Sequence, residues 1–192
     1  MQGIKRTGIM GGTFDPVHVA HLALAEAARE RFGLDRVLFV VSAFPPHKPA
    51  GGITPAEARY EMVRLAVESN PYFQPCDLEM KRNTPSYTVD TVRELGELFP
   101  GEELYLILGM DEAQNFRKWR EYETILKKCR VAAAWRPGSG EPDPELPVIC
   151  FHAPEMNISS SDIRKRIAAG RSVRYLVPEA VYDYITEKGL YL

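Results

Sequence analysis

Two patterns of hydrophobic residues alternate along this chain. The first is the short, nearly continuous apolar run, which is typical of strands covered on both faces in a parallel sheet. Such runs occupy residues 36–42 (RVLFVVS), 104–108 (LYLIL) and 129–135 (CRVAAAW). The second is the helical spacing, in which apolar residues recur every three or four positions. Its clearest example is residues 18–32, which Gly33 follows as a typical helix stop.

Weaker signals fill the remaining length. Further strands are expected within residues 3–10, at 73–80 and at 148–152, and further helices at 54–69, from 86 or 87 to about 99, just after 109, at 160–169 and at 178–188. The helix at 54 has its own start signal. Thr54 as N-cap, Pro55 at the first helical position and Glu57 three residues after the cap predict a capping box. The last two helices are each followed by a glycine, Gly170 and Gly189.

This alternation predicts a Rossmann-like, doubly wound α/β fold, with a mainly parallel sheet and helices on both faces. We expect a single domain over residues 1–192, with a core at about 1–155 and a small C-terminal helical part at about 156–192. Ligands of such folds bind outside the carboxyl ends of the strands. The loops at those ends are residues 11–21, 43–52, 109–119, 135–140 and 157–162, which are also the loops with unusual chemistry.

Composition narrows the function classes. The chain has 192 residues, of which 45% are hydrophobic and 26% charged, and a net charge of −2, so no overall basic field recruits nucleic acid. It holds no apolar run of about 18 residues, which excludes a transmembrane helix, and the apolar stretch near the N-terminus is too short for a signal peptide. The scattered Cys76, Cys129 and Cys150 are expected to be buried thiols in a reducing, cytoplasmic setting.

The stretch GGTFDPVHVAH, at residues 11–21, joins two kinds of anion-binding group. Glycines after the first strand let the backbone approach a ligand closely, and the following helix presents free N–H groups and a positive dipole end. His18 and His21 share a face of its first turn, where both imidazoles can donate to phosphate oxygens. A glycine turn with two ordinary histidines is the plainer alternative. A two-histidine metal site is another, although Cys, Asp or Glu supplies no evident third ligand nearby.

A second anion-binding pattern is NISSSDIRKR, at residues 157–166. Serine hydroxyls and backbone N–H groups converge at one helix start, and Arg164 lies within about one turn of them. The alternative is a well-capped surface helix. Together with residues 11–21, the pattern favours a second phosphate site, while Lys165 and Arg166 are expected to face solvent.

Both patterns carry a family resemblance. GGTFDPVHVAH resembles the GxFxPxHxGH signature of the nucleotidyltransferases that share a core with class I aminoacyl-tRNA synthetases, and ISSSDIR resembles their ISSTxIR signature. FPPHKP, KRNTPSYTVDT, GMD, WREYETI and WRPG match, in order, the bacterial nicotinate-nucleotide adenylyltransferases, so the resemblance covers essentially the whole chain. It implies that ATP and nicotinate mononucleotide react to give deamido-NAD and pyrophosphate. Ala20 departs from the pattern, which usually has glycine there, so its methyl group bears on how adenosine packs.

The resemblance, together with the residue chemistry, gives the expected site. ATP is expected to contact Gly11, Gly12, Thr13, Phe14, His18, His21, Gly109, Asp111, Arg136, Ile158, Ser160, Ser161 and Arg164. The second substrate is expected to contact Asp15, His47, Lys48, Thr88, Trp119 and Arg120, the last through its backbone N–H. Each assignment has a structural alternative: a turn for Asp15, a polar loop for His47 and Lys48, helix capping for Thr88 and edge packing for Trp119.

The expected mechanism needs no protein base. A phosphate monoester has its second pKa near about 6, so the mononucleotide phosphate is largely a dianion at neutral pH. Catalysis then consists of positioning and charge neutralisation by His18, His21 and Arg164. Mg²⁺ would bridge the ATP phosphates and keep most of its waters, so no protein metal ligands are expected.

Several alternatives stay open at this point. Within the same superfamily they are adenylyl transfer to phosphopantetheine and cytidylyl transfer to a phosphorylated alcohol, although His18 and the PSYT and Trp119 segments speak against the first. From another class, a non-catalytic nucleotide sensor could keep the same pocket. The sequence leaves both a monomer and a homo-oligomer open.

Overall fold

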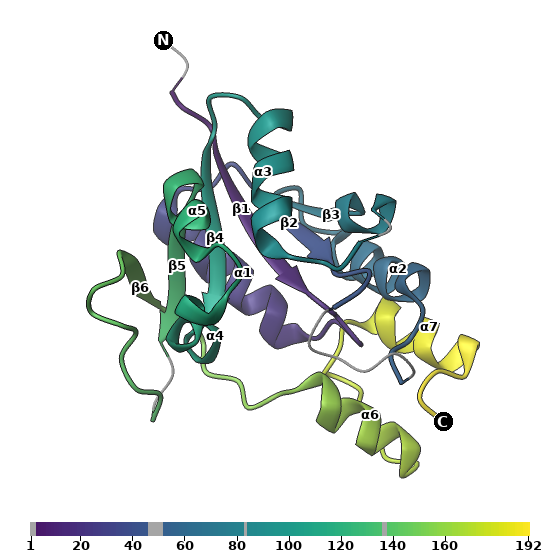
Figure 1. The fold of residues 1–192 in the computed structure, drawn as a ribbon. Coiled ribbons are helices and arrows are strands. Elements are labelled where there is room, and N and C mark those ends of the chain that lie inside the picture. The colour runs from purple at the N-terminus through teal and green to yellow at the C-terminus, as the bar shows by residue number, and fades with distance from the viewer. Residues whose placement is uncertain (1–2, 46–51, 83, 136–137) are drawn as a thin grey trace.

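A computed structural model describes residues 3–45, 52–82, 84–135 and 138–192. Its centre is a six-stranded sheet in which every neighbouring pair is parallel, in the order β3-β2-β1-β4-β5-β6 (Figure 1). The strands are β1 Arg6–Gly12, β2 Arg36–Val41, β3 Phe73–Cys76, β4 Glu103–Gly109, β5 Arg130–Trp135 and β6 Val148–His152. This is the doubly wound order of Rossmann-like folds, so the predicted fold class is confirmed.

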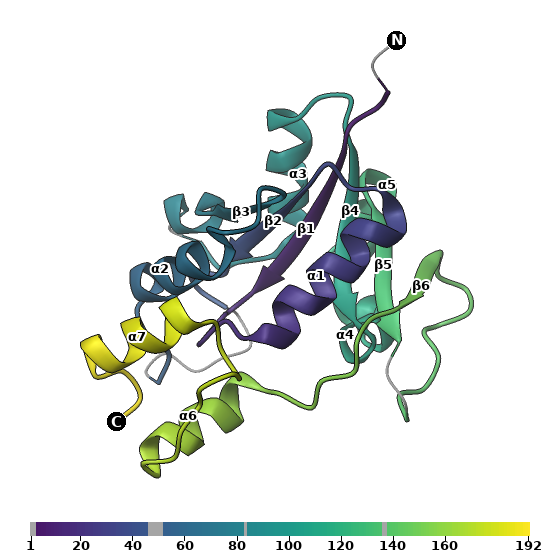
Figure 2. The same cartoon turned by 180° about the vertical axis from the view of Figure 1, so that it is seen from behind.

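Helices cover both faces of the sheet. They are α1 Val19–Phe32, α2 Ala56–Val67, α3 Thr88–Leu98, α4 Met110–Gln114, α5 Tyr122–Lys128, α6 Ser160–Ala168 and α7 Glu179–Lys188, with 3₁₀ turns η1 Leu78–Lys81 and η2 Phe116–Lys118. Figure 1 shows α3 and α5 in front of the sheet, and Figure 2, from behind, shows α1 and α2 on the opposite face. The C-terminal helices α6 and α7 lie at the end of the molecule toward which β1 runs.

The two faces have separate hydrophobic clusters. One joins the sheet to α1, α2 and the C-terminal helices, and it includes Ile163 of α6 and Val181 and Ile185 of α7. The other joins the opposite face to α3 and α5 through residues such as Val92 and Ile125. Because α6 and α7 share the first cluster, they belong to the same hydrophobic core as this face of the sheet, and α7 packs on α2. The division of the chain into domains stays a prediction.

The sequence signals for the ends of helices and strands were correct at some elements and wrong at others. Helix α1 ends at Gly33, whose φ of 60° is the left-handed conformation that glycine adopts without a side-chain penalty. The predicted capping box at Thr54 was wrong, because α2 begins one residue later, at Ala56, and its cap position is Pro55, which makes no side-chain cap hydrogen bond. The strand predicted for residues 73–80 was also too long. It ends at Cys76, and the chain turns into η1.

The prediction of three buried thiols was correct only for Cys129. Cys76 is partly exposed and Cys150 is exposed. Cys150 lies on the edge strand β6, where its neighbour Phe151 is buried. Since successive side chains of a strand point to opposite faces, Cys150 is directed away from the core.

Candidate active site

The loop between β1 and α1 has little room for side chains. A Cβ atom at Gly12 would lie 2.9 Å from the ring of Phe14, whereas one at Gly11 would meet nothing within 4 Å. Phe14 is 2% exposed and packs against Phe39 and the edge of His21, so its side chain belongs to the core and only its backbone remains for the predicted ATP contact. The loop is therefore fixed by a buried aromatic ring and is open at Gly11.

The two histidines form one unit at the start of α1. His18 is the N-cap residue, and its backbone N–H donates a hydrogen bond to Nδ1 of His21 at 3.2 Å. The two rings stack with their centroids 3.7 Å apart. Because Nδ1 of His21 accepts, the proton of the neutral ring lies on Nε2, which is then its donor atom. The predicted pairing of the imidazoles at a helix N-terminus is present.

The second predicted motif meets the first. Ser159 is the N-cap of α6 and accepts from the backbone N–H of Asp162. Ser160 Oγ donates to the carbonyl oxygen of Pro16 at 2.9 Å, and Arg164 Nη1 donates to the carbonyl oxygen of Asp15 at 2.7 Å. Segments almost 150 positions apart in the sequence thus place two helix N-termini beside one loop, an arrangement suited to binding several phosphates.

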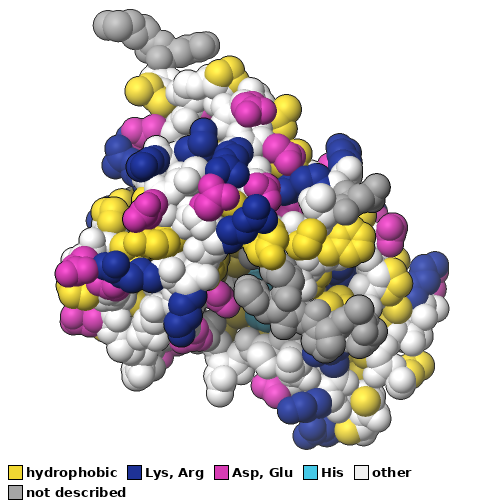
Figure 3. Space-filling model, viewed as in Figure 1, with side chains coloured by type: hydrophobic (Ala, Val, Ile, Leu, Met, Phe, Trp, Pro, Cys, Tyr) yellow, Lys and Arg dark blue, Asp and Glu magenta, His cyan; other side chains and the backbone are white. Residues whose placement is uncertain are grey.

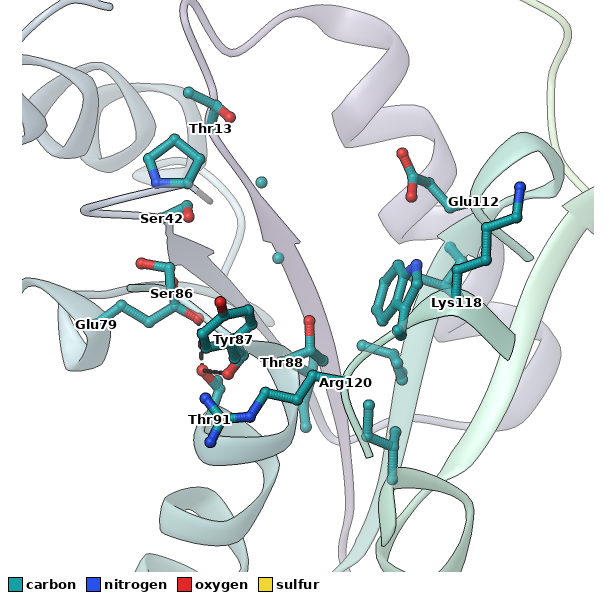
Figure 4. Close-up of a pocket in the computed structure, with 18 residues that line it drawn as sticks. Thr13, Ser42, Glu79, Ser86, Tyr87, Thr88, Thr91, Glu112, Lys118 and Arg120 are labelled. Carbon is teal, nitrogen blue, oxygen red and sulfur yellow. Dashed lines mark hydrogen bonds between the residues drawn. The ribbon is translucent and has the colours of Figure 1, made fainter. Parts of the chain in front are cut away.

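A cavity of about 390 Å³ lies at the carboxyl ends of the strands on the α3 side. It is lined by Ile9, Gly11, Gly12, Thr13, Ser42, Pro45, Glu79, Ser86, Tyr87, Thr88, Thr91, Leu106, Leu108, Glu112, Lys118, Trp119, Arg120 and Ile125. Figure 4 shows Tyr87 and Thr88, at the start of α3, across the cavity from Lys118. The cavity therefore brings together Gly11, Thr88, Trp119 and Arg120, which were predicted from separate segments of the sequence.

The wall of the cavity that carries Trp119 is supported by a second aromatic ring. Trp119 both lines the cavity and packs on Phe116, with ring centroids 5.2 Å apart, so the edge packing is present and the predicted substrate contact stays a prediction. The Arg120 guanidinium lies 4.7 Å from the centre of the Tyr87 ring and 3.8 Å from the carboxylate of Glu121. It is half-exposed and connects this wall to the start of α3.

A buried polar network behind the cavity was missed by sequence analysis. Thr91 donates through Oγ1 to Glu79, and Arg82 Nη2 donates to the same Oγ1 at 2.7 Å. Arg82 also pairs with Glu94, at 3.2 Å between Nε and Oε1. Glu79 and Thr91 are both buried, and Thr91 lies one helical turn after Thr88. The ionisable pair Glu79 and Arg82 just before PSYT could have indicated the network, but the apolar pattern favours a strand through residue 80.

A second cavity, of about 250 Å³, lies between α1 and β5. It is lined by Ala20, Leu24, Gly109, Ala134, Trp135, Ala153, Pro154, Glu155, Met156 and Asn157. Of the predicted ATP contacts, Gly109 is in this wall, and Asp111 follows it on the exposed first turn of α4. Ile158 is packed against the hydrophobic cluster on the α1 side.

Other predicted positions do not face these cavities or cannot be placed. Asp15 is 2% exposed, and its carboxylate is turned inward, where Oδ1 accepts a hydrogen bond from the Tyr191 phenol at 2.7 Å. His47, Lys48 and Arg136 lie outside the described residues. Figure 3 shows a hollow on the face seen in Figure 1, with a histidine side chain visible inside it.

Metal-ligand clusters and membrane-spanning helices are both absent from the described residues. Across residues 3–45, 52–82, 84–135 and 138–192, no group of three or more His, Cys, Asp or Glu side chains is arranged to hold a metal ion. No helix in the described part of the chain has the length and apolar character needed to cross a bilayer.

Comparison with known proteins gives consistent matches over nearly the whole chain. The sequence model of the cytidylyltransferase-like family matches residues 9–166. A protein of Thermus thermophilus, named as a probable nicotinate-nucleotide adenylyltransferase, is 50% identical over 186 residues, covering 97% of this chain and 99% of the relative. A protein of the same name from Geobacter metallireducens is 45% identical over 211 residues, covering 97% and 98%.

A solved structure extends the comparison to the fold. The nicotinic acid mononucleotide adenylyltransferase of Plasmodium falciparum, in complex with NaAD, superposes with a TM-score of 0.81 at 21% identity and covers 97% of each chain. At that identity the likeness concerns the fold.

Proposed function

Because this chain belongs to the cytidylyltransferase-like family and, within it, to the nicotinate-nucleotide adenylyltransferases, we propose that it transfers the adenylyl group of ATP to nicotinate mononucleotide. The products are deamido-NAD and pyrophosphate. The observation that supports this most directly is the meeting of residues 11–21 with α6, where Arg164 and Ser160 bond to the backbone of Asp15 and Pro16 beside the 390 Å³ cavity.

The triphosphate lies at the two helix N-termini. The proposed donors are the Nε2–H of His21, the imidazole of His18, and the N–H groups that begin α1 and α6. Ser160, Ser161 and Arg164 hold the β- and γ-phosphates. These groups neutralise charge at the reacting α-phosphorus and on the departing pyrophosphate, which is the main contribution a protein makes to phosphoryl-type transfer.

The reaction is an in-line displacement. An oxygen of the mononucleotide phosphate forms a bond to the α-phosphorus while the bond from that phosphorus to the bridging oxygen of the β-phosphate breaks. The nucleophile is already a dianion near neutral pH, so no side chain has to remove a proton. ATP enters as its Mg²⁺ complex, so the metal arrives with the substrate.

The 390 Å³ cavity takes the nicotinate half. Trp119 stacks on the ring, and the ring carboxylate accepts hydrogen bonds from Thr88 and from backbone N–H groups at the start of α3 and at Arg120. A neutral amide in the same place would need an acceptor as well as donors. We therefore expect nicotinate mononucleotide to be preferred to nicotinamide mononucleotide. His47 and Lys48 are proposed to hold its phosphate.

The 250 Å³ cavity takes the adenosine half. Gly109 lines it directly, and Asp111 is proposed to accept hydrogen bonds from the ribose hydroxyls, with Arg136 on the adenine side. Ala20 contributes its methyl group to the same wall, so this residue, which departs from the family pattern, directly borders the proposed adenosine site.

We propose that the protein acts in the cytoplasm.

A turnover assay tests the function. Purified protein with MgATP and nicotinate mononucleotide should release pyrophosphate and form deamido-NAD, whereas phosphopantetheine, or CTP in place of ATP, should support little turnover. Nicotinamide mononucleotide in a parallel reaction should give a kcat/KM at least about tenfold lower, since an unpaired buried polar group costs about 1–3 kcal/mol. Nucleotide binding without pyrophosphate release would instead indicate a sensor. Equal kcat/KM values for the two mononucleotides would refute the carboxylate assignment.

A further inference from the structure

The last residues of the chain return to the loop that carries the site. Helix α7 ends at Gly189, and two residues later the Tyr191 hydroxyl donates to Oδ1 of Asp15 at 2.7 Å. Figures 1 and 2 both show the C-terminus beside α6 and α7. Tyr191 has a φ of 68°, a left-handed conformation that bulky residues seldom adopt. Such a conformation persists only where the surrounding contacts fix it, so the tail is specifically docked.

Asp15 connects this tail to Arg164. Its backbone carbonyl accepts from Arg164 Nη1 at 2.7 Å, and its carboxylate Oδ2 lies 3.9 Å from the same nitrogen. Asp15 is 2% exposed, whereas the Arg164 side chain keeps 31% of its surface open to solvent. The buried residue is thus the anchor, and the guanidinium extends from it toward the surface. Arg164 Nη2 donates to Ser161 Oγ at 3.4 Å, so the second terminal nitrogen of the guanidinium is oriented toward the start of α6.

Tyr191 is suited to hold the Asp15 side chain in place by a hydrogen bond. Burial raises the pKa of Tyr191, so its hydroxyl stays protonated and acts as a donor throughout the physiological range. A phenol donating to a carboxylate is a charge-assisted hydrogen bond, which is stronger than a neutral one. Arg59, which is also buried and attracts Asp15 electrostatically, supplies charge compensation from the other side.

We propose that Tyr191 and Asp15 are positioning residues that fix the Arg164 guanidinium for the departing pyrophosphate. The proposal rests on the role assigned to Arg164 above. It replaces the sequence-based assignment of Asp15 as a substrate contact, because the Asp15 carboxylate is turned away from the cavities and toward the C-terminal tail.

The test compares single-atom changes. Tyr191→Phe removes only the hydroxyl, and Asp15→Asn probes the same hydrogen bond from its other side. Tyr184→Phe removes a phenol from the same C-terminal region and serves as the control, as does deletion of Leu192, which is 91% exposed. For each variant, kcat and the KM for MgATP and for nicotinate mononucleotide are measured by pyrophosphate release, and thermal unfolding is recorded.

We expect Tyr191→Phe and Asp15→Asn each to lower kcat/KM for ATP by about tenfold or more, the loss typical of one charge-assisted hydrogen bond. The KM for the mononucleotide should stay near its wild-type value, and both controls should behave as wild type. In an Arg164→Ala background, adding Tyr191→Phe should cost less than about twofold, because the residue to be positioned is gone.

Several results would overturn the proposal. One is an unchanged kcat/KM in Tyr191→Phe, another is an undiminished further loss in the Arg164→Ala background, and a third is failure of both single variants to fold, which would mark a purely structural pair. Wild-type protein that does not turn over would refute the proposed function instead. The tail would then be tested by calorimetric titration with a non-hydrolysable ATP analogue, where Tyr191→Phe should weaken binding only if Arg164 is present.

Discussion

Replacing Arg59 with methionine should be among the most destabilising single changes in this protein. Arg59 lies in the first turn of α2 and is 1% exposed. Its Nε donates to the carbonyl oxygen of Thr54, and its Nη1 donates to those of Thr13 and Ser42, all at 2.7 Å. One guanidinium thus connects the loop after β1, the loop after β2 and the start of α2. Methionine fills a similar volume but leaves three carbonyls without these donors and the Asp15 carboxylate without its neighbouring positive charge.

The magnitude follows from the buried charge. Burial lowers the pKa of Arg59, while attraction to Asp15 opposes that shift, so the charged form depends on the partners just described. Removing one partner of a buried charged network costs about 3–5 kcal/mol. In a protein of 192 residues this corresponds to a fall in Tm of about 10 °C. Activity should fall as well, because both loops lie at the proposed site.

Urea and thermal unfolding of Arg59→Met measure this loss, and Arg64→Met is the matched control. Arg64 lies five residues further along α2, but its ion pairs with Glu61 and Glu68 are on the surface. Exposed pairs contribute little to stability, so the control should unfold close to wild type. An Arg59→Met protein with a wild-type unfolding midpoint, or equal destabilisation by both variants, would refute the role given to Arg59.

Substitutions at three further positions test the site itself. His18→Ala should lower kcat by about 100-fold or more with the fold intact by circular dichroism, as loss of a preorganised donor does, and a nearly wild-type kcat would contradict its role. Thr91→Val removes the hydroxyl between Glu79 and Arg82 and should raise the KM for nicotinate mononucleotide by about tenfold without changing the KM for ATP. Thr91→Ser keeps the hydroxyl and should restore the wild-type KM, whereas equal effects of the two would point to packing. Ala20→Val narrows the 250 Å³ cavity and should raise the KM for ATP alone, so a higher KM for the mononucleotide would argue against the adenosine assignment.

The sheet was predictable because its signals are local and repeated. A strand buried on both faces needs a continuous apolar run. The positions of such runs along the chain were therefore enough to locate β2, β4 and β5 closely. Element ends were less secure because tertiary contacts decide them. Thr54 carries the chemistry of an N-cap, yet α2 begins after Pro55, where the Arg59 side chain joins the Thr54 carbonyl oxygen to those of Thr13 and Ser42 in two other loops.

The same distinction applies to the site. Residues 11–21 and 157–164 could be paired from sequence, because parallel strands bring their carboxyl ends to one edge and both segments follow such ends. Arg59 could not be identified, because an arginine within an amphipathic helix ordinarily belongs to the solvent face. Tyr191 was hidden for a similar reason, since an aromatic residue next to the C-terminus carries no sign of what it contacts.

The polar networks around Arg59 and Arg82, neither of which was predicted from the sequence, have a common physical origin. Where parallel strands end, backbone carbonyls and polar side chains of adjacent loops are buried without sheet partners, and a guanidinium with five N–H donors can satisfy several of them. Arg59 does so beside the loop that meets α6, with Asp15 as its nearby acid, whereas Arg82, behind the 390 Å³ cavity, donates to the Thr91 hydroxyl and lies beside Glu79. Each of these cations lies near an acidic side chain, which offsets part of its positive charge. The loops are thereby held rigid, and attraction for the substrate anions is left to the helix N-termini, the imidazoles and Arg164.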